Sequence, residues 1–117
     1  MEQRWFVWGF LGERVTAPWG DWNVDDPSVG ATPAGPSPAW SVPPGVSPKD
    51  IAGKLRDMGH RTREILLTHS LEEPARIGGR FTEDPATLEW ICFHVLAEYA
   101  RHAGHFDIVR ELSTASS

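Results

Sequence analysis

The sequence of 117 residues has little of three features that mark common protein classes. Its one cysteine, Cys92, has no partner for an internal disulfide, which excludes a disulfide scaffold and suits a reducing compartment. Eleven Lys and Arg stand against 16 Asp and Glu, and the net charge of -5 argues against nucleic-acid binding and a basic membrane-binding patch. No apolar run approaches the roughly 20 residues of a membrane span. We therefore expect one small cytoplasmic domain over residues 1–117, with no nucleic-acid or membrane partner.

Tryptophan, in contrast, is abundant, and four of the six tryptophans lie within the first 22 residues. Because an indole must bury a large surface, the chain begins with side chains that need a partner to pack against. The apolar stretch over residues 5–11 is too short for the apolar core of a secretory signal and lacks a clearly positive start. We expect no signal peptide.

Proline dominates residues 17–46, which hold seven of the ten prolines and four glycines. Proline disfavours both helix interiors and central strands, so this segment is predicted to be a long Pro/Gly-rich loop. Its acidic part, residues 21–26, lacks the glycine and distal glutamate of a calcium-binding loop and is interpreted as a solvated turn.

Three helices are predicted around this loop, which gives an all-α fold. Residues 2–16 hold an apolar run that fits a helix or a strand, and the nearby Pro18 favours a helix ending near Thr16. Residues 47–69 begin with Ser47 as a cap, a proline in the first helical position and Asp50 three residues after the cap. Its expected apolar stripe comprises Ile51, Leu55, Met58, Thr62 and Ile65.

The last predicted helix, residues 84–112, has the clearest periodicity. Asp84 is expected to cap it and Pro85 to occupy its first position. Its expected stripe comprises Leu88, Cys92, Val95, Tyr99, His102, Phe106 and Val109. The position of Cys92 on this stripe indicates a buried, inert thiol.

One group of residues on this helix has side chains that can bind a metal: His94, Glu98, His102 and His105. The four fall within an arc of about 80°, and the first three are spaced four residues apart, so neighbouring side chains can converge. Imidazole and carboxylate together suit Zn, Ni, Fe or Mn. The alternative is that these side chains only form a polar side of the helix and are hydrogen-bonded to their neighbours. One helix cannot complete a tetrahedral metal site by itself. A third ligand could come from His60 or His69, which could equally be surface histidines.

This last helix resembles that of the DinB-like superfamily, in particular an actinobacterial branch of uncharacterised proteins related to the mycothiol-dependent maleylpyruvate isomerases. The matching residues are Trp90, His94, Glu98, Ala100-Arg101-His102, Gly104-His105 and Asp107. Residues 2–6 look like the end of that family's second helix, and the acidic loop and the helix from Ser47 follow in family order.

The resemblance implies an up-down-down-up four-helix bundle that binds a divalent metal, most often Zn or Ni, through three side chains. Two ligands come from the last helix and correspond to Glu98 and His102, with His94 and His105 as neighbouring or alternative ligands. The third is a histidine on the second helix, shortly before the stretch that matches residues 2–6. This chain begins at Met1, after that point, so the resemblance predicts a bundle reduced to about three helices with an incomplete metal site.

Two functions follow from this resemblance. The first is a metal- and thiol-dependent transferase or isomerase, in which a low-molecular-weight thiol attacks a small-molecule substrate as its thiolate. The second is a non-enzymatic helical interaction or stress-associated protein, because the third ligand has no counterpart. A reduced bundle would leave the apolar face around Trp5 and Trp8 uncovered, so we also expect a homodimer or larger assembly.

Overall fold

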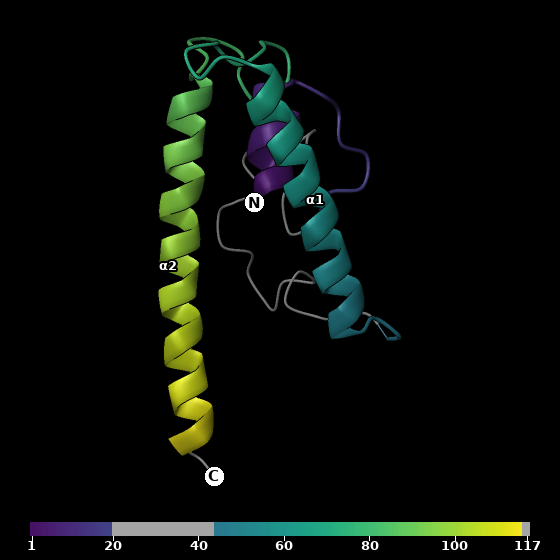
Figure 1. Ribbon diagram of the computed structural model, residues 1–117, viewed down its shortest axis with the longest axis vertical. Coiled ribbons are helices and arrows are strands. Elements are labelled where there is room, and N and C mark those ends of the chain that lie inside the picture. Colours follow the sequence, from purple (N-terminus) through teal and green to yellow (C-terminus); the bar gives the residue numbers. More distant parts are fainter. Residues whose placement is uncertain (20–43, 116–117) are drawn as a thin grey trace.

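The computed structural model describes residues 1–19 and 44–115, and within these ranges it contains three helices and no strand. They are η1 (Gln3–Phe10), α1 (Pro48–Thr68) and α2 (Leu88–Ala115). The long helices α1 and α2 run in opposite directions, joined at the upper end of the molecule, and η1 lies at that same end (Figure 1). The all-α prediction is confirmed. Most of the predicted Pro/Gly-rich loop and its acidic turn, residues 20–43, lie outside the described residues.

The first helix is a π-helix and is shorter than predicted. The N–H of Leu11 donates to the carbonyl of Phe6 at 3.0 Å, five residues back, which is the wider turn of a π-helix. Gly12 then adopts a left-handed conformation with φ of 66°. That residue ends the helical path, so the predicted end near Thr16 is wrong.

The second helix begins as the sequence predicts. The N–H of Asp50 donates to the Ser47 hydroxyl at 3.2 Å, and the N–H of Ser47 donates to the Asp50 carboxylate at 2.8 Å. This reciprocal capping box satisfies two N–H groups that a helix start leaves unpaired, and its hydrogen bonds lower the pKa of Asp50. Its predicted stripe is buried only in part, because Met58 and Ile65 are covered whereas Ile51 and Leu55 are about half exposed.

The start of α2 differs from the prediction, since the helix begins at Leu88 and not near Pro85. Asp84 has a φ of 44° and is not a cap. The N–H of Leu88 donates to the carbonyl of Glu73 at 3.0 Å, which ties the helix start to the preceding connection. Thr87 fills the capping role, because its hydroxyl accepts from the N–H of Trp90 at 3.3 Å.

The hydrophobic core lies where η1 packs between the two long helices. Its buried residues are Phe6, Phe10 and Leu11 of the N-terminal segment, Ile65 of α1, Ala75, and Leu88, Ile91 and Val95 of α2. Both long helices pack against η1, which is only eight residues long. The short helix η1 therefore covers only one half of each long helix. The far half of the apolar stripe of α2 stays exposed, and the side chain of Phe106 there is 72% exposed. The predicted burial of that half is wrong.

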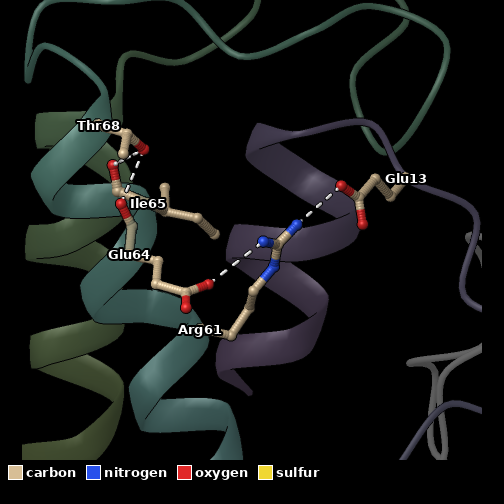
Figure 2. Close-up of polar contacts among 5 residues, drawn as sticks. All are labelled: Glu13, Arg61, Glu64, Ile65 and Thr68. Atoms are coloured by element: carbon tan, nitrogen blue, oxygen red, sulfur yellow. Dashed lines mark hydrogen bonds and ion pairs between the residues drawn. The ribbon is translucent and has the colours of Figure 1, made fainter.

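A side-chain contact also fixes the segment after η1 to α1. Arg61 of α1 reaches Glu13 at 3.0 Å and its own-helix neighbour Glu64 at 3.5 Å (Figure 2). These groups are exposed, so the ion pairs contribute at most about 1 kcal/mol each. Their main effect is to orient the chain as it leaves η1.

The connection over residues 69–87 closes the upper end of the molecule. Its backbone bonds directly to η1, since the N–H of Arg76 donates to the carbonyl of Phe10 at 2.9 Å and that of Arg80 to Trp8 at 3.4 Å. Trp8 is consequently buried, and the prediction of an uncovered apolar face around Trp5 and Trp8 is wrong. Among the described helices, none has the length and apolarity needed to cross a bilayer.

Candidate metal-binding site

Glu98 and His102 lie together near the middle of α2. The Oε2 atom of Glu98 is 3.7 Å from Nε2 of His102, as expected for side chains one helical turn apart. The Glu98 side chain is largely covered, and the neighbouring Arg101 donates a hydrogen bond to the same oxygen. A metal ion bonded at about 2 Å to each group spans a gap of up to about 4 Å, so the pair can share one ion.

The two other histidines of this group have different surroundings. The ring of His94 stacks on Trp90 with centroids 5.0 Å apart, and it meets Trp5 of η1 at 4.1 Å. His105 lies beside His102, edge to face, with a centroid distance of 6.0 Å. His94 is therefore part of an aromatic contact between α2 and η1, whereas His105 extends the exposed polar side of the helix.

A third ligand does not emerge within residues 1–19 and 44–115, where no cluster of three His, Cys, Asp or Glu side chains could hold a metal. His60 is exposed on α1. The ring nitrogen Nδ1 of His69 donates to the carboxylate of Glu73 at 2.9 Å, and the ring packs edge-on against Phe10. The described residues thus supply two donors of the type that zinc and nickel take, and a closed site needs more than two.

One polar contact next to the pair was missed from the sequence. The carboxylate of Glu2 accepts hydrogen bonds from the hydroxyls of Thr62 on α1 and Tyr99 on α2, both at 2.5 Å. It therefore links the two long helices beside Glu98. Thr62 and Tyr99 both stand on the predicted stripes, but nothing in the sequence indicates that Glu2 meets them.

The contact has a consequence for the ionisation of Tyr99. Burial, together with the hydrogen bond and negative charge of Glu2, raises the pKa of Tyr99 to about 12. Tyr99 therefore remains a protonated donor at neutral pH. Because the folded pKa exceeds the unfolded value, this stabilisation is complete below about pH 10 and is lost as pH rises towards 12.

Cys92 faces the core side of α2, one turn after Leu88. It is a free thiol and only partly exposed. Burial raises the pKa of Cys92 and so disfavours its thiolate. The thiol is thus less buried than predicted, and its inertness stays a prediction.

Comparison with known protein families identifies one family that matches nearly the whole chain. A family model described as mycothiol-S-transferase matches residues 1–115. No curated protein and no solved structure matches the chain. The family is DinB-like, which confirms the resemblance carried by the last helix. The chain therefore belongs to the mycothiol-S-transferase family.

Proposed function

We propose that the protein acts in thiol-dependent group transfer, with Glu98 and His102 as two ligands of a divalent metal, zinc or nickel. The observation that carries this proposal is the 3.7 Å approach of a carboxylate and an imidazole on the helix where the resemblance implies two of three ligands. The family match supports mycothiol as the thiol. Isomerisation through the same thiol remains the alternative reaction.

The roles of the residues follow from their chemistry. A metal bound at Glu98 and His102 would stabilise a thiolate and lower the pKa of its thiol. Arg101 holds the Glu98 carboxylate in place. We assign Cys92 no role as the nucleophile, because burial raises the pKa of its thiol and so disfavours the thiolate. We place the reaction in the cytoplasm, because chemistry that uses a free thiol suits a reducing compartment.

Metal titration tests the assignment. We expect zinc or nickel, titrated into the purified protein and followed by calorimetry, to bind at one site per chain. Glu98→Ala and His102→Ala should each weaken the affinity at least tenfold, since each removes a direct ligand. His60→Ala, an exposed histidine of α1, is the matched control and should leave the affinity unchanged. Equal affinities for all four proteins would refute the site.

A second candidate function is helical association with another copy of the chain. The exposed half of the α2 stripe favours it: Phe106 stands 18 residues after the fully buried Leu88, which places both on the same side of the helix. Val109 and Leu112 are also exposed, and so are Ile51 and Leu55 on α1. We propose that a second copy covers this surface, because exposed apolar patches of this kind promote association.

Sedimentation velocity at micromolar concentration tests this association. We expect the wild-type protein to sediment as a dimer or larger species and Phe106→Glu to sediment as a monomer. Phe93→Glu is the matched control, because Phe93 is 65% exposed but lies on another side of α2. A wild-type monomer at this concentration would exclude the association.

A further inference from the structure

The candidate ligand pair shares one side of α2 with the apolar stripe. Val95, His102 and Val109 are spaced seven residues apart, about 20° of rotation per step, so they lie nearly in one line along the helix. Val95 is 5% exposed, in the core with η1, whereas Val109 is 62% exposed. The His102 side chain stands between them and is 56% exposed, and Glu98 lies one turn away. The pair therefore borders the surface that we propose a second copy covers.

A second copy of the chain fits this surface because of how the two long helices are arranged. The helices α1 and α2 run in opposite directions, and both continue beyond η1 (Figure 1). There they expose apolar side chains, Ile51 and Leu55 on α1 and Phe106 and Val109 on α2. Two such antiparallel helices are half of a four-helix bundle, and a two-fold axis supplies the other half from an identical chain. Because His102 lies in line with Val109, that contact reaches the imidazole as well.

Covering the pair has a different cost with and without a bound ion. Without metal, the Glu98 carboxylate already has the charge of Arg101 beside it, so the imidazole of His102 is the main polar group to cover. An ion held by two protein ligands keeps its other coordination positions for water or a thiol. Apolar side chains of a second copy supply no such ligands, and moving a charged group out of water is costly. Association and metal binding at this pair therefore oppose each other.

We propose that self-association regulates the metal site: the metal-free chain associates through the exposed half of α2, and binding of a divalent metal at Glu98 and His102 releases the partner. This inference rests on the proposed function, both for the ligands and for the association. Coupling between two binding events is reciprocal, so association weakens the affinity for metal by the factor by which metal weakens association. The associated form thus keeps the site free of metal, and dilution or excess metal opens it.

Sedimentation velocity of the full chain, with and without zinc, tests the direction of this coupling. The metal-free wild type is expected as a dimer or larger species, and saturating zinc should shift it to the monomer. Glu98→Gln, which removes a ligand but keeps the shape of the side chain, should stay associated in both conditions. His60→Ala, an exposed histidine of α1, is the matched control and should respond like the wild type. Zinc that enlarged the wild-type assembly, or that released Glu98→Gln, would overturn the proposal.

Zinc affinity, measured by competition with a chelating dye at several protein concentrations, tests the reciprocal effect. From micromolar to submillimolar protein, the wild-type affinity should fall about fivefold or more, the lower end of typical coupling between two sites. Phe106→Ser should stay monomeric and bind zinc with one affinity throughout, since serine removes the apolar ring without adding a charge beside His102. Phe93→Ser, on another side of α2, should behave like the wild type. A wild-type affinity independent of protein concentration would contradict the coupling.

The outcomes separate this inference from the proposed function. Zinc that binds at Glu98 and His102 without changing the assembly would refute the regulation and leave the metal ligands standing. Zinc that fails to bind would refute the metal ligands and the regulation with them. A metal-free wild type that sediments as a monomer would refute the association and the regulation, and the metal ligands would stand.

Discussion

Replacing Gly79 by alanine is expected to destabilise the protein by about 3 kcal/mol, the upper end of the range for overpacking. A Cβ atom at this position would stand 2.5 Å from the carbonyl oxygen of Trp8 and 2.7 Å from Cα of Gly12. Both neighbours are backbone atoms, so no side chain can rotate away. The connection must move off η1, which weakens the 3.4 Å hydrogen bond from Arg80 to Trp8.

Urea unfolding followed by tryptophan emission measures this effect. Gly59→Ala is the matched control: nothing lies within 4 Å of its Cβ position, and it sits inside the exposed part of α1. Alanine there should stabilise the protein by about 0.5–1 kcal/mol through helix propensity. The two substitutions are chemically identical and should change the free energy of unfolding in opposite directions. A Gly79→Ala protein as stable as the wild type would contradict the close packing of connection and η1.

Phe10→Ala is expected to cost about 3–5 kcal/mol, the range for removing a buried phenylalanine. Phe10 is 2% exposed, lies in the core cluster and meets the ring of His69 edge-on at 5.1 Å. The loss comes from apolar surface returned to water and from the cavity that remains. Since small domains are stable by about 5–15 kcal/mol, the change removes a large part of the total.

Thermal unfolding followed by circular dichroism at 222 nm checks the loss, with Phe93→Ala as control. Phe93 is 65% exposed, so its truncation should change the free energy of unfolding by less than about 1 kcal/mol. If both variants lost the same stability, the core would not be centred on η1. If neither lost any, Phe10 would not be buried.

Local features of the fold were predictable from the sequence, whereas the extent of burial was not. The capping box of α1 depends on Ser47 and Asp50, which are three residues apart, so the sequence alone predicts it. The stripe of α2 is also local, but how much of it is covered depends on the length of η1. Asp84 and Pro85 resemble a helix start, yet hydrogen bonds to the connection move that start to Leu88.

The same division holds for the candidate site. Glu98 and His102 come together because helical periodicity alone places them one turn apart. The Glu2 contacts join residues 60 and 97 positions apart, and the stacking of Arg80 on Trp5 joins the connection to η1. No periodicity encodes such distant pairs, so only the folded chain reveals them.

The one-sided position of the core implies a gradient of local stability along α2. Val95 is its last buried residue, and Glu98 and His102 follow within two turns, at the boundary between the packed and the exposed half. Beyond that boundary the backbone amides have only intrahelical hydrogen bonds to protect them from exchange with solvent. An ion that bridged Glu98 and His102 would therefore also stabilise the first turns of the exposed half of α2. The affinity for the ion and the fraying of this helix are thus linked.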